Sequence, residues 1–150
     1  MELDYFWTFV YKNNVFEYEG LNAMKQILAR PDPCNLHELR LVSCTTNTLV
    51  TSELINYLVI GRVHLRSLSL VKMHVDKLSL ARLATFVENS EYLEDLDVSW
   101  NDLLTNDFDP LLHVLSNNKT LVTLNLSSNI IIDKKDQNNK FDFKNVSAMD

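Results

Sequence analysis

Four segments of the chain share one pattern of apolar residues, and this repetition limits the possible folds more than any other feature of the sequence. Each segment reads L-x-x-L-x-L. The three apolar columns recur after 29, 28 and 28 residues, and leucine fills 11 of the 12 positions. The columns are Leu36, Leu65, Leu93 and Leu121; Leu39, Leu68, Leu96 and Leu124; and Leu41, Leu70, Val98 and Leu126. A fixed period of this length predicts a stack of similar structural units.

A second apolar pattern, with a helical period, follows the first in three of the units. Its three residues fall at positions i, i+3 and i+4 and recur every 28 residues. They are Ile55, Leu58 and Val59; Leu83, Phe86 and Val87; and Leu111, Val114 and Leu115. This spacing is typical of one helix face, whereas the alternation around Leu39 and Leu41 is typical of a strand. We therefore expect each unit to be a strand, a turn and a helix, with the strands in one parallel sheet and the helices behind it.

These features resemble the leucine-rich repeats, L-x-x-L-x-L-x-x-N/C-x-L, and the 28–29-residue spacing resembles their ribonuclease-inhibitor-like subclass. The ninth position holds Cys44, Met73, Asn101 and Asn129, so Met73 departs from the pattern. Asn or Cys at this point can satisfy backbone groups as the chain leaves the strand. The resemblance implies an α/β fold, a right-handed solenoid with parallel strands on the concave face and helices on the convex face. It also implies protein–protein recognition.

The resemblance covers residues 36–132, which we expect to form about four repeats. Residues 1–35 should form an N-terminal helical cap or degenerate repeats, with a possible strand in VFEYEG and an amphipathic helix in LNAMKQILAR. The first residues with helical spacing are Leu3, Phe6, Trp7, Val10 and Tyr11. Residues 133–150 form a polar tail, and the last unit lacks its helix unless FDFKNVSAM supplies one. Since an open apolar layer is a liability, we expect the tail, a neighbouring subunit or further chain to cover it.

Composition and charge argue against several classes of protein. The formal net charge of −6 disfavours binding to nucleic acid, whose phosphates are also negative. No uninterrupted apolar stretch reaches the roughly 18 residues that membrane insertion needs. Glu2 and Asp4 stand where a signal peptide would carry basic residues, and two cysteines are too few for a disulfide scaffold. We therefore expect a cytoplasmic protein.

The candidate binding residues come from strand alternation. If the repeated leucines face the core, their neighbours lie on the concave face. One row of that face would change from basic to acidic along the stack. Trp100 follows the third strand, where it is either an interface anchor beside charged residues or a ring packed on the adjoining turn. The candidate partner-binding residues are Glu38, Arg40, Ser69, Asp95, Asp97, Trp100 and Asn125.

The sequence offers little for catalysis or for cofactors. Two glycines leave no phosphate-binding loop. Cys34 and His37, with Cys44 nearby, fall short of the ligands that zinc requires. Asp95 and Asp97 would lie about 7 Å apart on a strand, near the separation in inverting glycosidases, but that chemistry also needs an enclosed cleft. We therefore expect no enzyme, no metal and no cofactor.

Two functions remain open from the sequence. The first is an intracellular module that binds another protein, of unknown identity, through its concave sheet face. The alternative is a structural subunit of a large intracellular assembly, for example a cytoskeletal or ciliary one. Such a subunit would be held by its ends and its convex helices.

Overall fold

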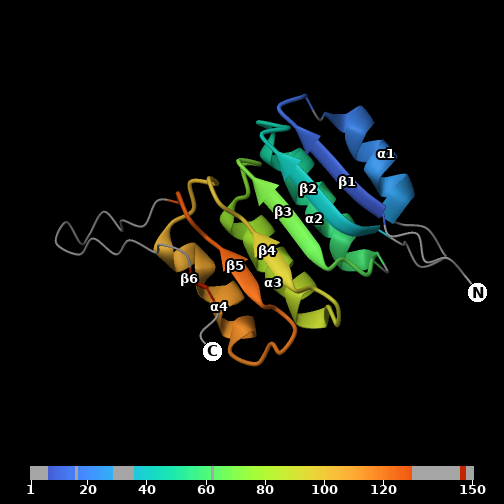
Figure 1. The fold of residues 1–150 in the computed structure, drawn as a ribbon. Coiled ribbons are helices and arrows are strands. Elements are labelled where there is room, and N and C mark those ends of the chain that lie inside the picture. Colours follow the sequence, from blue (N-terminus) through green and yellow to red (C-terminus); the bar gives the residue numbers. More distant parts are fainter. Residues whose placement is uncertain (1–6, 16, 29–35, 62, 130–145, 148–150) are drawn as a thin grey trace, which may run out of the picture.

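The computed structural model describes residues 7–15, 17–28, 36–61, 63–129 and 146–147. Strands and helices alternate along these ranges (Figure 1). The elements in chain order are β1 (Trp7–Lys12), α1 (Tyr18–Leu28), β2 (Leu36–Val42), α2 (Thr48–Ile60), β3 (Ser67–Val71), α3 (Lys77–Asn89), β4 (Asp95–Asp97), a 3-10 helix η1 (Thr105–Phe108), α4 (Asp109–Leu115), β5 (Thr123–Asn125) and β6 (Val146–Ser147). The expected alternation of strand and helix is therefore present.

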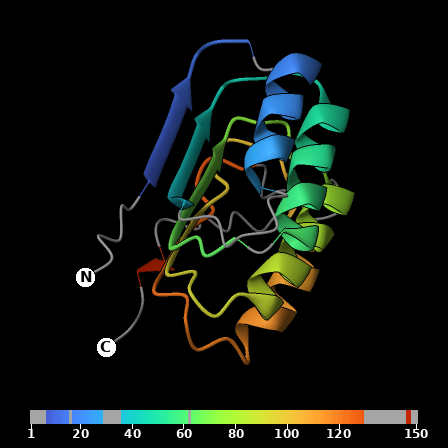
Figure 2. The same ribbon diagram turned by 90° about the vertical axis from the view of Figure 1, so that its right-hand side faces the viewer.

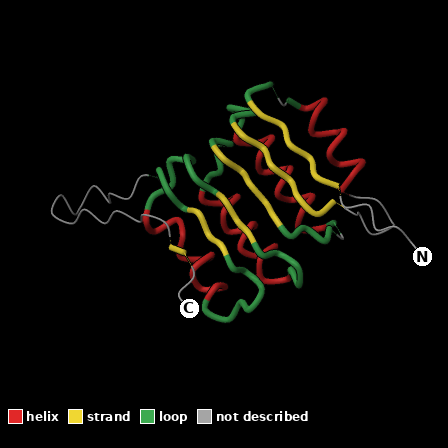
Figure 3. Tube along the Cα trace, viewed as in Figure 1, coloured by secondary structure: helices red, strands yellow, loops and turns green. Residues whose placement is uncertain are grey.

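The strands form one sheet whose spatial order is the order of the chain, β1 to β6. Strands β1 to β5 are all parallel, and the leucine columns pair across them: Leu39 with Leu68, Leu68 with Leu96, and Leu96 with Leu124. Helices α1 to α4 lie together on one side of the sheet (Figure 2), and the tube view gives the same two layers (Figure 3). The α/β class and the strand register expected from the leucine spacing are confirmed.

The helices begin where the sequence supplies side-chain caps. The Asn47 side chain accepts a hydrogen bond from the Leu49 N–H (3.0 Å) before α2, and Asp76 accepts one from the Ser79 N–H (2.7 Å) before α3. Such caps satisfy the N–H groups that a first helical turn leaves without an intrahelical partner. Helix α4 begins with Pro110 in its first turn, where a missing N–H costs nothing.

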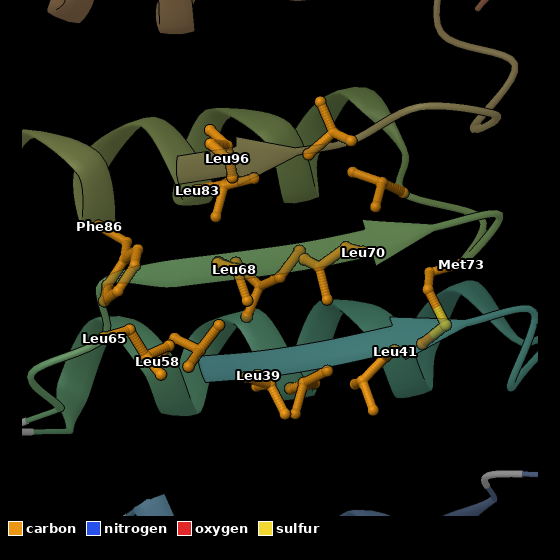
Figure 4. Close-up of a cluster of buried hydrophobic side chains, with 14 of the residues drawn as sticks. Leu39, Leu41, Leu58, Leu65, Leu68, Leu70, Met73, Leu83, Phe86 and Leu96 are labelled. Carbon is orange, nitrogen blue, oxygen red and sulfur yellow. The ribbon is translucent and has the colours of Figure 1, made fainter. Parts of the chain in front are cut away.

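The core lies between the sheet and the helices. Leu39, Leu41, Leu68 and Leu70 are completely buried, and they point towards the helix layer (Figure 4). In the last unit the equivalent leucines, of which Leu124 is one, are only half-buried. Burial of a leucine side chain contributes about 1.5–3 kcal/mol, so the last unit gains less from its apolar residues than the interior units.

The first element corrects the prediction for the N-terminus. Trp7–Lys12 is a strand paired with β2, not a helix. Helical and strand periods both fit this segment, but its aromatic and β-branched residues favour a strand. Phe9 and Tyr11 pack against the core while Val10 is exposed, which is a period of two. Leu3 and Phe6 of the predicted helix lie outside the described residues.

The segment after β1 also differs from the prediction in part. VFEYEG is not a strand: Val15 is exposed, and helix α1 already begins at Tyr18. The amphipathic helix in LNAMKQILAR is confirmed, because Leu21, Met24 and Leu28 are the buried residues of α1.

At the other end, the suggested helix in FDFKNVSAM falls mostly outside the described residues. Its described part, Val146–Ser147, is instead the strand β6, which runs antiparallel to β5. No helix in the described ranges has the length and apolar character needed to cross a membrane.

Candidate functional site

The candidate site is the sheet face that carries no described helix, which we call the open face. Strand pairing brings six of the seven predicted residues into two rows on it. In one row Arg40 pairs with Ser69, Ser69 with Asp97, and Asp97 with Asn125. The other row joins Glu38 and Asp95 through Ser67. The predicted change from a basic to an acidic residue along the first row is therefore present in the structure.

Asp97 is held in a fixed position by two hydrogen bonds. Its Oδ1 accepts from the Ser99 N–H (2.9 Å), and its Oδ2 accepts from Nδ2 of Asn125 (3.0 Å). Asn125 repeats the first of these bonds one unit later, because its Oδ1 accepts from the Ser127 N–H (3.0 Å). The carboxylate of Asp97 and the amide of Asn125 are thus ordered before any partner arrives, which lowers the entropic cost of binding.

The structure shows no ion pair between the described charges of the open face. Among the described residues the one ion pair is Arg66–Glu94 (4.0 Å), and these residues precede β3 and β4. Arg40 and Asp95 are half-buried and have no such partner in the described ranges. Ser69 contributes least to the surface, since only 4% of it is exposed between the longer side chains of Arg40 and Asp97.

Trp100 lies beyond the carboxyl end of β4, and 58% of it is exposed. This exposure favours the anchor interpretation over a ring packed on the adjoining turn. Its backbone is in the left-handed region, with φ of 60°. For residues other than glycine, asparagine and aspartate this conformation costs about 1–2 kcal/mol. An exposed tryptophan is a common anchor of binding surfaces.

The left-handed turn recurs in every unit. Ser43, Lys72, Trp100 and Ser128 all have φ between 51° and 60°, and they occupy the position just before the ninth residue of the pattern. The turn therefore belongs to the repeat, and tryptophan is its bulkiest occupant. Ser43 and Ser128 indicate that serine is accommodated in the same conformation.

Asparagine side chains fix these turns by bonds that run between units. Asn101 is buried; its Oδ1 accepts from the N–H groups of Met73 (2.9 Å) and Val75 (3.1 Å), one unit earlier. Asn129 does the same for the N–H groups of Asn101 (2.9 Å) and Leu103 (3.3 Å). Trp100 is thereby placed beside a residue whose backbone and side chain are both bound.

Met73, which departs from the repeat pattern, does not leave its turn unsatisfied. Its N–H is bound by Asn101, and its carbonyl accepts from the Thr51 hydroxyl of α2. Met73 itself is completely buried, so at this one turn an apolar side chain extends the core instead of binding the backbone.

Sequence reasoning missed the contribution of β1 to the open face. Val10 pairs with Arg40, so an exposed apolar side chain extends the first row, and Lys12, which pairs with Val42, adds a second cation beside it. The signal was the alternation of Thr8, Val10 and Lys12 with aromatic residues, which the helical interpretation of this segment obscured.

No family model, curated protein or solved structure matches the chain. The described side chains of the site offer charge, hydrogen-bonding groups and one large aromatic on an open sheet surface.

The cysteine considered as a metal ligand has another role in the structure. The Cys44 thiol donates to the carbonyl oxygens of Tyr11 (3.0 Å) and Val42 (3.2 Å), which is the same work that asparagine amides do in later turns. Cys34 lies outside the described residues. Burial raises the pKa of the Cys44 thiol above its usual value, and the Val42 backbone opposes this less strongly.

We expect Cys44 to make the protein less stable in alkaline solution. Because the folded state raises the pKa of the thiol, its contribution is complete below the unfolded pKa of about 9 and is lost as pH rises towards the folded pKa. The free energy of unfolding should be measured from pH 7 to 11 for Cys44→Ser and the parent, both carrying Cys34→Ser. The parent should lose stability relative to Cys44→Ser above pH 9; a constant difference between the two would refute the idea.

Proposed function

We propose that this chain is a leucine-rich-repeat solenoid of the ribonuclease-inhibitor-like subclass, without enzymatic activity, that binds another protein on its open face. Support for the family comes from the strand–turn–helix units of 28 to 29 residues with register-matched leucines. The bonds from Asn101 and Asn129 to the preceding unit add to it. In such a solenoid the open face is the concave one.

The observation that carries the proposed binding role is Trp100. A mostly exposed tryptophan in a left-handed turn lowers the stability of the free protein and adds exposed apolar surface. A partner that buries the ring would remove this apolar surface from water, whereas the backbone strain belongs to the turn in every unit. Two carboxylates lie nearby: the ordered one of Asp97, three residues earlier, and that of the half-buried Asp95. They would favour a partner whose contacting segment is basic.

The test uses substitutions that the chain itself contains at equivalent positions. Trp100→Ser introduces the residue found at Ser43 and Ser128, and Asp95→Thr introduces that of Thr123. Tyr18→Ser is the matched control, because Tyr18 is 54% exposed but lies on α1. The tagged proteins would be incubated with lysate of the cells that express the chain, and co-purifying proteins identified by mass spectrometry.

We expect a defined partner to bind the parent and Tyr18→Ser equally. Loss of a central aromatic anchor costs about 2 kcal/mol, so Trp100→Ser should weaken binding about 30-fold. Trp100→Asn should do the same while raising the free energy of unfolding by up to about 1 kcal/mol, because asparagine tolerates the left-handed conformation. Asp95→Thr should also weaken binding, and equal binding by the parent, Trp100→Ser and Asp95→Thr would refute a role for the open face.

The alternative, a subunit of a larger cytoskeletal or ciliary assembly, is favoured by a different observation. Leu121, Leu124 and Leu126 of the last unit are half-buried, and Leu49 and Leu78 are exposed at the starts of α2 and α3. Size-exclusion chromatography with light scattering distinguishes the two. A stable monomer at micromolar concentration argues against an obligate subunit, whereas aggregation or self-association argues for one.

A further inference from the structure

A second surface, away from the open face, contains a cavity. It measures about 230 Å³ and lies between the carboxyl ends of α2 and α3. Leu58, Val63 and Phe86 line its apolar part. Leu58 and Phe86 approach each other from α2 and α3 at the amino end of β3 (Figure 4). Pockets for cofactors and drug-sized ligands measure about 300–1,000 Å³, so this cavity fits a single long side chain.

The turn beside the cavity has a shorter side chain than its equivalent in the next unit. Ser90 and Asn118 occupy the same place, 28 residues apart, and each caps its turn: Ser90 Oγ accepts from the Leu93 N–H (3.1 Å), and Asn118 Oδ1 from the Leu121 N–H (2.7 Å). Asn118 also reaches across to the preceding helix, because its Nδ2 donates to the Val87 carbonyl (3.4 Å).

A serine side chain has a single hydroxyl group. Ser90 therefore caps its own turn, but its side chain makes no second bond to the preceding helix, as the Asn118 amide does. Val59 of α2 is the equivalent of Val87, and no described side chain donates to its carbonyl as Asn118 does to Val87. The cavity has Val59 and Ser90 in its lining, so an asparagine at position 90 would extend its amide into this space.

The rim of the cavity has the chemistry of a cation site. Two helices end here, and the carboxyl end of a helix carries a partial negative charge. Glu91 adds a full negative charge to the lining. Tyr92 and His64 stand beside it with ring centroids 4.5 Å apart, and the face of a tyrosine ring attracts cations.

We propose that this cavity binds an arginine side chain presented by a protein partner. The aliphatic stem lies against Leu58 and Phe86, and the guanidinium lies at the rim with Glu91 and Tyr92. Arginine fits better than lysine, because its planar, weakly hydrated head stacks on aromatic rings and still pairs with a carboxylate. This site is independent of the open face, so it holds whether or not Trp100 contacts a partner.

The test is a titration of the whole 150-residue chain with N-acetyl-arginine methylamide, followed by the ¹H–¹⁵N NMR signals of Ser90, Glu91 and Tyr92. N-acetyl-citrulline methylamide is the matched control, because it has nearly the same shape without the charge. We expect the arginine probe to bind with a dissociation constant of about 1–10 mM, which one side chain with one exposed ion pair supports. The citrulline probe should bind at least fivefold more weakly.

Two substitutions then locate the site. Ser90→Asn restores the bridge that Asn118 makes, so it should leave the melting temperature unchanged or higher and weaken the arginine probe at least tenfold. Glu91→Gln should weaken it about twofold to fivefold. Arg62 follows Gly61 in the sequence, and its guanidinium could compete with the probe. Arg62→Gln is therefore titrated as well, and this variant should bind the probe as tightly as the parent or more tightly.

The outcomes are decisive in either direction. Binding of citrulline as tight as that of arginine, or full binding by a folded Ser90→Asn, would overturn the proposal, as would the absence of binding by both the parent and Arg62→Gln. Should Ser90→Asn fail to fold, Glu91→Gln and citrulline decide between the same outcomes. Trp100→Ser must bind the probe as tightly as the parent does. This control tests the cavity independently of the proposed binding role of the open face.

Discussion

Replacement of Asn101 by alanine is expected to lower the free energy of unfolding by about 3–5 kcal/mol. Asn101 is only 5% exposed, and its side chain makes five hydrogen bonds to backbone groups. Besides the two N–H groups it binds, its Nδ2 donates to the carbonyls of Leu70 (2.7 Å), Val98 (2.9 Å) and Ser99 (3.1 Å). The Val98 and Ser99 carbonyls would keep the bonds they accept from Asn129 Nδ2 and the Lys72 N–H, but alanine would remove the acceptor of the Met73 and Val75 N–H groups. Each buried group left without a partner costs about 1–3 kcal/mol before relaxation.

Urea unfolding followed by circular dichroism measures this effect. Asn89→Ala is the matched control, because the Asn89 side chain makes one exposed bond, to the Thr85 carbonyl (2.8 Å), and its loss should cost less than about 0.5 kcal/mol. Asn101→Asp separates the two halves of the role, since aspartate keeps the acceptor for Met73 and Val75 but loses the amide donors. A loss below 1 kcal/mol for Asn101→Ala would contradict the role assigned to these bonds.

Replacement of Gly61 by alanine is expected to cost about 1–3 kcal/mol through steric overlap. A Cβ at this position would lie 2.7 Å from the carbonyl oxygen of Leu28, 2.8 Å from that of Tyr57 and 3.1 Å from Cγ2 of Val63. Two of these neighbours are backbone atoms, so the ends of α1 and α2 must move apart. The φ of −78° suits alanine, and the cost therefore comes from contact and not from the dihedral angle.

Gly20→Ala provides a control of opposite sign. Gly20 lies inside α1, where alanine is a better helix former, and the change should raise the free energy of unfolding by a few tenths to about 1 kcal/mol. The two variants would be compared by thermal and urea unfolding under the same conditions. Equal effects of the same sign at Gly20 and Gly61 would contradict the packing of α1 against α2 described above.

Much of the fold follows from the sequence because its signals are local and repeated. The leucine column that contains Leu39 and Leu68 predicts the strand register. The apolar spacing around Leu58 and Phe86 predicts the positions of the helices. The first strand was mispredicted because six residues satisfy a period of 2 and a period of 3.6 almost equally. The aromatic and β-branched residues favour the strand, and the pairing of Val10 with Arg40, a contact between residues 30 apart, stabilises it.

The candidate site was less predictable for two physical reasons. The position of Arg40 beside Ser69 and Asp97 follows from the repeat, but the burial of Ser69 depends on the size of its neighbours. The left-handed turn at Trp100 carries no glycine or asparagine to signal it; serine, lysine and tryptophan adopt it because the following turn residues are bound between units. Side-chain bonds of this kind become visible only once the units are stacked.

The order of the sheet has a consequence for how the molecule comes apart. Each strand from β1 to β5 is bonded only to the strands before and after it in the chain, so opening at one edge leaves the remaining bonds intact. Unfolding can therefore proceed by successive detachment, and folding can start in the middle and spread to both sides. Backbone amides of β2 and β3, each paired with a parallel strand on both sides, should exchange with solvent most slowly, and protection should decline towards β1 and β5. Local stability should therefore depend on position along the chain. The outer units should open and close while the inner units remain folded.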